Sequence, residues 1–510
     1  MMGYQSGYQP KLFYPEINLE ERIPEHHILR RIKSRIDFDF IYHEVRDSYG
    51  ENGNVSVPPP VILKMILLLI LYNVRSEREL MSTIPLRLDW LWFLGYDLDS
   101  IIPNHSVLSK ARSRWGFSVF KNFFERIVWQ CVEAGLVDGT KLFMDSSLIQ
   151  ADASNNSVIK RETLKPYIVQ GFHELERRLE EKEPSSENDH EPKSGSANRR
   201  HVSTTDPDAS VTRQGSGESK LQYKAHRSVD GQSEIITATE VTPGEVNEAH
   251  LLLPLLQMHR KNTEKPATTV VADTKYGTVE NYLGCHDLGI KAHIPDLKAS
   301  QQETGSRKGI FSEDAFRYDP EIDTYRCPAG NHLKRRNYNR NRDAFEYKCS
   351  PKICNACPLV HQCTASKSGR SIKRHRRQEE LDRMRGDTQS PLSRKDLRTR
   401  QHLMERSFAR ATRYGFKRAR WRRLWRVQIQ EYLTAAIQNL MILLRNLKEH
   451  GHREALLIDK RPSPIFLALI LYIEMLFAEI WKYIFTRRII EPSFQSNLSK
   501  ICFGQQAVYP

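Results

Sequence analysis

The chain has 510 residues, of which 39% are hydrophobic, and it carries a formal net charge of +15. This length allows two to four domains with a sizeable core, and the composition is neither that of a repeat protein nor that of a largely disordered one. The first residues lack a basic segment followed by an apolar core, so we expect no secretory signal and a cytoplasmic location.

The positive charge is concentrated in one segment. Between Arg326 and Gln430 there are 29 Lys and Arg residues against 8 Asp and Glu, a local excess of +21, which leaves 15 − 21 = −6 for the rest of the chain. A confined basic block is expected of a surface that binds a polyanion such as a phosphate backbone. The alternative, a solvated charged helix, usually mixes both signs.

Residues 1–130 show a helical pattern. Proline stands at the start of the apolar tract Pro58–Val74, where its missing N–H does least harm to a helix, and Ser76 and Glu79 have capping-box spacing. Pro103–Gly116 follows as a short polar helix. This region has two interpretations of nearly equal weight: a module that presents a helix to DNA, or a module for dimerisation or for a lid.

From Leu136 the pattern changes to short β-rich segments. The predicted strands are Lys141–Ser147, the hairpin Lys220–Ser228 with Glu234–Val241, Thr268–Ala272 and Gly289–Ile294, with a helix at His250–His259. We interpret the polar stretch Glu180–Ser219 as a mobile surface insertion. A strand, an antiparallel pair, a helix and then a parallel strand is the order of the RNase H-like fold.

Three acidic residues stand where apolar runs end: Asp145, Asp273 and Glu405. A carboxylate at the exit of a buried strand lies at the sheet edge where ligands bind in open α/β sheets. Two strand-end aspartates and a glutamate on a later helix could hold two Mg²⁺ ions for in-line attack on a phosphodiester. A lone acid in such a position is usually solvated or a helix cap.

Five segments together resemble the DDE transposases of bacterial insertion sequences: Pro59–Ile84, Pro103–Gly116, Gly135–Ser154, Val271–Tyr282 and Met404–Phe416. The resemblance implies an RNase H-like mixed α/β core, with its sheet flanked by helices, behind a helical N-terminal domain. It also implies that Asp145, Asp273 and Glu405 hold Mg²⁺ or Mn²⁺. Related enzymes often carry a lysine about seven residues after the glutamate, whereas this chain has Thr412 there.

Five cysteines lie within the stretch from Cys327 to Cys363. Cys354 and Cys357 have zinc-knuckle spacing, Cys327 and Cys363 could complete a Cys₄ site, and the resemblance favours this set over one using Cys349. Reduced structural thiols are the competing interpretation.

The resulting domain prediction has five parts: residues 1–130 helical, 131–300 the first part of the core with the insertion at 180–219, 301–375 a zinc insert, 376–450 the basic helical end of the core, and 451–510 an apolar tail. The apolar stretches Val61–Tyr72 and Ile465–Phe485 contain charged residues, so we interpret both as packing helices and expect no membrane span.

The predicted function is cleavage and strand transfer of an insertion sequence, on double-stranded DNA that comprises the element ends and the target, by a homodimer associated with the nucleoid. Arg406, Arg410, Arg413, Lys417 and Arg420 recur every three or four residues, so on a continuous helix they would form one DNA-binding face, unless Gly415 interrupts it. The alternatives are an RNase H-like nuclease without transposition, an inactive DNA-binding repressor, and a structural or RNA-binding zinc protein.

Overall fold

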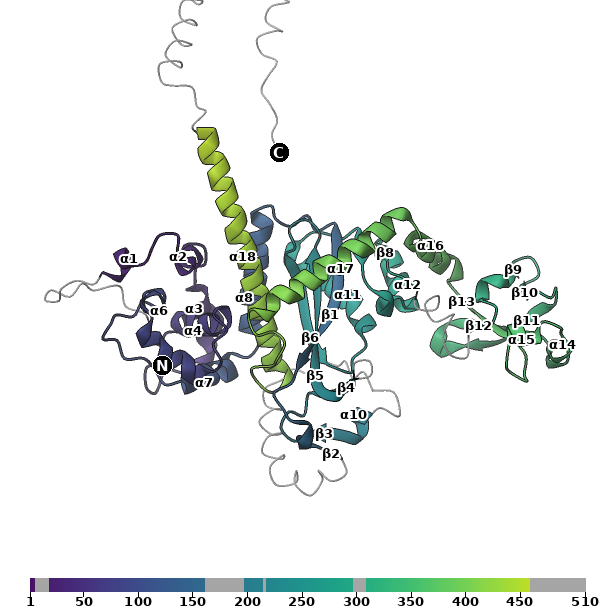
Figure 1. Ribbon diagram of the computed structural model, residues 1–510, viewed down its shortest axis with the longest axis horizontal. Coiled ribbons are helices and arrows are strands. Elements are labelled where there is room, and N and C mark those ends of the chain that lie inside the picture. Colours follow the sequence, from purple (N-terminus) through teal and green to yellow (C-terminus); the bar gives the residue numbers. More distant parts are fainter. Residues whose placement is uncertain (5–17, 161–196, 214–216, 297–308, 459–510) are drawn as a thin grey trace, which may run out of the picture. The chain divides into compact units, whose positions relative to one another are not determined.

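The computed structural model describes residues 1–4, 18–160, 197–213, 217–296 and 309–458 (Figure 1). Residues 1–444 form one compact unit and residues 445–510 a second.

In the described residues, eight α-helices precede the first strand. They are α1 (Leu19–Arg22), α2 (Ile28–Lys33), α3 (Phe40–Val45), α4 (Pro59–Leu71), α5 (Glu77–Thr83), α6 (Leu88–Leu94), α7 (Ser106–Trp115) and α8 (Ser118–Glu133). Helix α4 begins at a proline and is buried along nearly its whole length, which explains why its sequence is apolar on every side. The Ser76 hydroxyl accepts a hydrogen bond from the backbone N–H of Glu79, so the predicted cap of α5 is present.

The main sheet has six strands in the order β4-β5-β1-β7-β8, with β6 also paired to β5. These strands are β1 (Lys141–Gln150), β4 (Ser210–Arg213), β5 (Ser219–Asp230), β6 (Ile236–Pro243), β7 (Thr269–Val271) and β8 (Lys291–His293). Strand β1 is antiparallel to β5 and parallel to β7, and β7 is parallel to β8. The predicted hairpin is therefore β5–β6, and the three other predicted strands are β1, β7 and β8.

The two faces of this sheet are covered differently because side chains alternate along each strand. Leu142 and Met144 of β1 pack in an apolar cluster with residues of α11 (Leu252–Thr263), α12 (Val279–Asp287) and α16 (Gln378–Thr388). The other face meets α17 (Pro391–Thr412), which crosses the sheet in Figure 1. On that side Lys141 Nζ lies 2.9 Å from Asp396 Oδ1, and Asp396 Oδ2 lies 2.8 Å from His293 Nδ1.

A fully buried ion pair joins the sheet to the last two helices. Arg227 of β5 donates to both carboxylate oxygens of Glu431 in α18 (Leu424–Ile458), at 2.6 and 3.0 Å, and to the backbone and hydroxyl oxygens of Ser407 in α17. Phe408 and Phe416 lie within 5.0 Å of its guanidinium. The carboxylate of Glu431 thus neutralises the charge of this guanidinium, and Ser407 accepts further hydrogen bonds from it. A charge in a protein interior requires such partners.

Helix α18 also covers the outer edge of β6. The backbone N–H groups of Val241 and Ile236 donate to the side-chain oxygens of Gln428 and Asn439, and the Asn439 amide donates to the Ile236 carbonyl. The unpaired groups of an edge strand are satisfied here by side chains of a helix, which blocks pairing with another chain.

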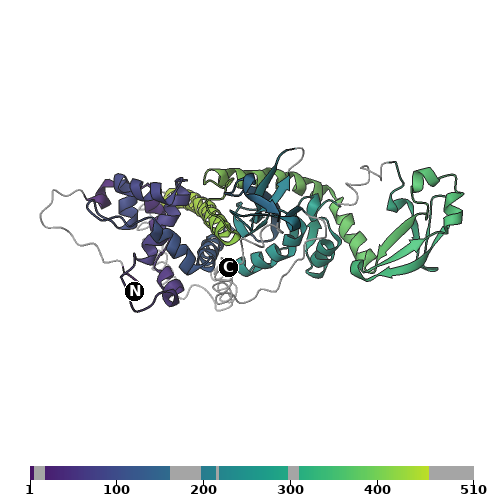
Figure 2. The ribbon, with the colours of Figure 1, turned by 90° about the horizontal axis from the view of Figure 1, so that it is seen from below.

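A second, five-stranded antiparallel sheet follows the main one, in the order β13-β12-β11-β10-β9 (green in Figures 1 and 2). Its strands are β9 (Arg317–Asp319), β10 (Thr324–Arg326), β11 (His332–Asn339), β12 (Ala344–Lys348) and β13 (Ser371–His375), and two short helices, α14 (Pro351–Asn355) and α15 (Val360–Cys363), lie between β12 and β13. The sequence analysis predicted a zinc insert here but no such sheet.

The prediction of a mobile insertion at 180–219 is wrong for part of that stretch. Its described residues contain α10 (Ala197–Arg200), β3 (His201–Ser203) and β4, and β3 pairs with β2 (Val158–Lys160). Strand β4 pairs with β5, so Val211 and Thr212 extend the edge of the main sheet. The polar composition had concealed these short strands. Residues 180–196 and Ile465–Phe485 lie outside the described residues, and within the described residues no helix is long and apolar enough to cross a membrane.

Candidate active site

The two predicted aspartates lie at equivalent positions on neighbouring parallel strands. The register pairs Phe143 of β1 with Val271 of β7, so Asp145 and Asp273 each stand two residues beyond the same pair. Because parallel strands keep their register, the two residues lie at the same level of the sheet, where β7 has ended and β1 continues to Gln150 beside β5. Asp273 also caps the 3₁₀ turn η5 (Thr274–Tyr276) by accepting from the Lys275 backbone N–H at 3.1 Å.

The surroundings of both aspartates raise their pKa values and so disfavour their ionised forms. Burial raises the pKa of Asp145, and the nearby charge of Asp273 adds to the increase, while Arg400 and the Ser146 backbone N–H oppose it. Burial likewise raises the pKa of Asp273, with a further increase from Glu248. Arg400 Nη1 lies 2.7 Å from Asp145 Oδ2 and supplies positive charge from α17. Two half-buried carboxylates that repel each other form a site that favours a cation.

Glu248 is a third carboxylate of this site, and the sequence analysis missed it. It begins the 3₁₀ turn η4 (Glu248–Leu251), and its Oε1 lies 3.2 Å from Lys224 Nζ and 3.1 Å from Lys275 Nζ. Although burial opposes its charge, these two lysines hold the pKa of Glu248 below its usual range. No apolar run ends at Glu248, so the signal that revealed Asp145 and Asp273 was absent. Its proximity to them depends on the packing of η4 on η5.

Glu405 lies on α17, five residues after Arg400. Five residues turn an α-helix by about 140° beyond a full turn, so the side chain of Glu405 leaves the helix on a different side from that of Arg400. Glu405 is exposed, and its Oε1 accepts from Gln401 Nε2 at 3.3 Å. Among the described residues, no hydrogen bond or ion pair joins Glu405 to either aspartate. The two aspartates thus lie on neighbouring parallel strands or just after them, whereas Glu405 leaves α17 on a different side from Arg400, the residue of that helix that contacts Asp145.

The five predicted DNA-binding residues do not share one helix. Helix α17 ends at Thr412, and Gly415 adopts a positive φ of 79°, so the predicted interruption at this glycine occurs. Lys417 and Arg420 therefore lie beyond the helix, so the condition for a single face, a continuous helix, is not met.

Their partners also differ. Arg406 and Arg410 both form ion pairs with Glu234, at 2.5 and 2.7 Å. Arg420 donates to the Val74 carbonyl and to Asn73, which ties it to the N-terminal helices. Arg413 and Lys417 are exposed. Of the five, these two present the most accessible positive charge.

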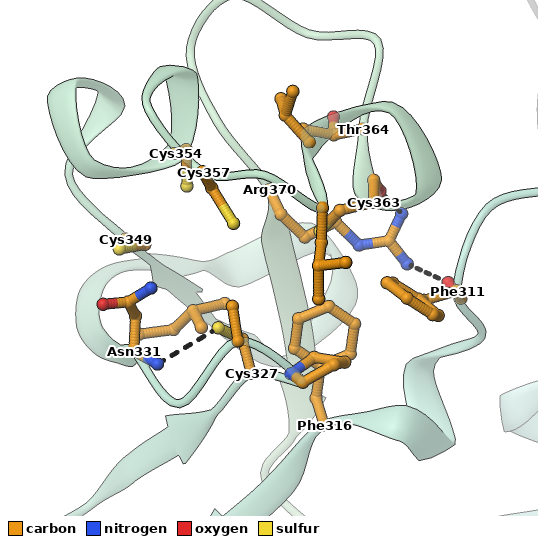
Figure 3. A pocket seen from close by; sticks show the side chains of 15 residues that line it. Phe311, Phe316, Cys327, Asn331, Cys349, Cys354, Cys357, Cys363, Thr364 and Arg370 are labelled. Carbon is orange, nitrogen blue, oxygen red and sulfur yellow. Dashed lines mark hydrogen bonds between the residues drawn. The ribbon is translucent and has the colours of Figure 1, made fainter.

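The five cysteines of the second sheet surround one cavity of about 30 Å³ (Figure 3). Cys327 follows β10 and its Sγ accepts from the Asn331 backbone N–H at 3.3 Å, and Cys349 follows β12. Cys354, Cys357 and Cys363 come from α14, α15 and the turn between them. Burial raises the pKa of Cys349 to about 11, with the neighbouring Cys354 adding to the increase. Cys349 therefore lines the same cavity, although the predicted set of zinc ligands did not include it.

In neither predicted metal site do three or more ligand atoms of the described residues all lie within 4.8 Å of one another. Within the described residues, the group of side chains whose ligand atoms all lie within 4.8 Å of one another is His286, Asp287 and Glu380. Arg377 occupies this group: its Nη1 lies 2.9 Å from Asp287 and its Nε lies 2.6 Å from Glu380. A guanidinium already compensates these carboxylates, so the cluster is an ion-pair network between α12 and α16.

Comparison with protein families identifies two parts of the chain. Residues 17–114 match the family described as Transposase domain (DUF772), and residues 326–444 match the family described as Transposase DDE domain. Both matched families are transposase domains, and together they support an insertion-sequence DDE transposase. No curated protein and no solved structure matches the chain.

The two matched ranges cover different parts of the chain. The first covers α1 to α7, and the second covers the cysteine cluster, α16, α17 and Glu405. Asp145 and Asp273 lie between the two matches, so their assignment depends on the strand register and electrostatics described above.

Proposed function

We propose that this transposase cuts DNA at the ends of its insertion sequence and joins those ends to target DNA in a reaction that depends on a divalent metal ion. Water attacks a phosphodiester at the element end and releases a 3′-hydroxyl, which then attacks a phosphodiester of the target. The observation that supports the proposal is the equivalent placement of Asp145, within β1, and Asp273, just after β7, each two residues beyond the paired residues Phe143 and Val271 of these parallel strands.

The strand order supports an RNase H-like core. Strands β6, β5 and β1 are successively antiparallel, and β7 and β8 continue the sheet parallel to β1. Helix α17 lies across the strands that carry the two aspartates.

Asp145, Asp273 and Glu405 would hold Mg²⁺ or Mn²⁺. Carboxylate oxygens are the ligands these ions prefer, and burial raises the pKa of both aspartates even though Arg400 lies nearby, so a further positive charge would stabilise their ionised forms. A bound divalent ion would supply charge stabilisation to the attacking and leaving oxygens of the phosphodiester. Arg400, which compensates Asp145 in this structure, would then be free to contact a DNA phosphate.

The test is cleavage of a duplex that carries the terminal repeats found beside the reading frame, with Mg²⁺ present. Asp145→Asn and Asp273→Asn should each lose at least about 100-fold in rate, since each removes a metal-holding charge. Asp138→Asn is the matched control, because this residue precedes β1 and should cut normally. Retained cleavage in both aspartate variants would refute the assignment.

The same assay distinguishes the two candidate glutamates. Glu405→Gln should lose activity to the same extent as the aspartate variants if it is the third acid. Glu248→Gln, which leaves Lys224 and Lys275 without their shared partner, should then have the smaller effect. The reverse order would assign the third acid to Glu248.

A further inference from the structure

Tyr276 carries a buried hydroxyl with no partner, directly beside the candidate active site. It is the last residue of η5, the turn that Asp273 caps, and its side chain is fully buried. Its Oη makes no hydrogen bond to any residue in the described part of the chain. Buried hydroxyls are nearly always hydrogen-bonded, because burying an unpaired one is costly.

The surroundings of Tyr276 indicate what kind of partner the hydroxyl would take. The Asn281 amide donates to the carbonyls of both Ala249 and Tyr276, which fastens η4 to η5 and brings Glu248 to the same place. Burial raises the pKa of Tyr276 well above its usual value, and the charges of Asp145, Glu248 and Asp273 raise it further. The hydroxyl therefore keeps its proton at neutral pH and can act as a donor.

We propose that the Tyr276 hydroxyl donates a hydrogen bond to an oxygen that enters the carboxylate site with the ligand. This inference rests on the proposed function. Two sources supply such an oxygen: the water that accompanies a divalent cation, or the phosphodiester of DNA. Tyr276 is thus a ligand-contacting residue whose hydroxyl has no partner among the residues that the structure describes.

The chain contains a matched control in Tyr282, which is also fully buried and lies six residues later in α12. Its hydroxyl donates to the Ile294 carbonyl at 2.7 Å. Tyr276→Phe and Tyr282→Phe remove the same atom from similarly buried rings, one without a partner in the protein and one with a partner.

The first measurement is thermal unfolding of the full chain without metal. Tyr276→Phe should unfold at the wild-type temperature or above it, because the variant no longer buries an unpaired hydroxyl. Tyr282→Phe should unfold at a lower temperature, because it leaves a buried carbonyl without its donor. A lower unfolding temperature for Tyr276→Phe would overturn the proposal, since it would mean that the hydroxyl has a partner inside the protein.

The second measurement is the affinity for Mn²⁺ alone, and for duplex DNA in the presence of Ca²⁺. Tyr276→Phe should weaken one of them by roughly 10-fold, while Tyr282→Phe changes neither. Weaker Mn²⁺ binding assigns the oxygen to water that accompanies the cation, and weaker DNA binding alone assigns it to the phosphodiester. Wild-type affinity in both overturns the proposal.

Asp273→Asn separates this inference from the proposed function. If Asp273→Asn loses Mn²⁺ binding while Tyr276→Phe retains both affinities, the carboxylate site stands and only the role of Tyr276 fails. If Asp273→Asn binds Mn²⁺ as the wild type does, the carboxylate site itself is wrong and both proposals fail.

Discussion

Glu240 is a single residue with a large effect expected on the pH dependence of stability. It lies on β6 opposite His226, and burial raises its pKa from 4.5 to about 7, although Lys121 opposes the shift. Between these two values the folded chain binds a proton that the unfolded chain has released. Stability therefore falls as pH rises through this window and is constant with respect to Glu240 above it.

Glu240→Gln should remove this contribution. The difference in unfolding free energy between wild type and variant should change by roughly 1–3 kcal/mol across the window, with the wild type losing stability relative to the variant as pH rises. Urea unfolding at a series of pH values measures this. Glu280→Gln, which alters a partly exposed acid in α12, is the control. Parallel curves for wild type and Glu240→Gln would contradict the assignment.

At the scale of single residues, a site residue could be predicted only where the neighbouring residues in the chain indicate its position. Asp145 and Asp273 were predicted because each ends an apolar run, and strand ends meet at a sheet edge. Glu248 and Tyr276 could not be predicted, because their position beside the aspartates depends on how two short turns pack together. The side-chain direction of Glu405 was also out of reach, since it depends on the rotation of α17 about its axis.

We expect a zinc ion to bind the cysteine cluster and stabilise it. Its cavity has room for one ion, and five sulfurs from several turns surround it. Metal analysis of the purified chain should find about one zinc, and Cys354→Ser or Cys357→Ser should abolish its binding. Cys131→Ala, which changes an isolated buried cysteine, should leave zinc content unchanged.

Two further variants decide which sulfurs are ligands. Cys327→Ser should lose zinc and Cys349→Ser should retain it if the four predicted residues are correct. The opposite result would replace Cys327 by Cys349, which the structure places beside Cys354. Zinc-free wild-type protein that unfolds at the same temperature as the zinc-bound form would contradict a structural role.

Periodicity predicted the elements well but not their limits. The spacing from Arg406 to Arg420 fits one helical face, yet α17 ends at Thr412. Charged residues tolerate both helix and loop, so their spacing could not fix the end, whereas Gly415, with its positive φ, could. The strands of the main sheet other than β4 were predicted because their apolar runs are short and bounded by turn residues.

Across the whole molecule, much of the basic block is compensated internally. Arg406 and Arg410 pair with Glu234, Arg418 and Arg422 with Asp152, and Arg423 with Asp208. Net charge in the sequence therefore overstates the charge available to DNA. We expect the accessible residues Arg413 and Lys417 to contribute most to the electrostatic part of binding.

Arg413→Gln and Lys417→Gln should each weaken DNA binding similarly for all sequences and lower the salt slope by about one. Glu234→Gln should strengthen binding, because it releases Arg406 and Arg410. Fluorescence anisotropy over a range of salt concentrations measures both effects. Lys261→Gln, an exposed cation outside the basic block, is the control. Unchanged salt dependence in the first two variants would remove these residues from the interface.

The buried pair of Arg227 and Glu431 sets an order of events during synthesis. The partners are 204 residues apart in the chain. At a synthesis rate of about 5–20 residues per second, Arg227 leaves the ribosome about 10–40 s before Glu431 exists. Until then β5 carries a cation that cannot be buried without its partner. We therefore expect the sheet that carries Asp145 to remain incompletely packed until the start of α18 has been synthesised, so that the candidate active site forms late in the life of the nascent chain.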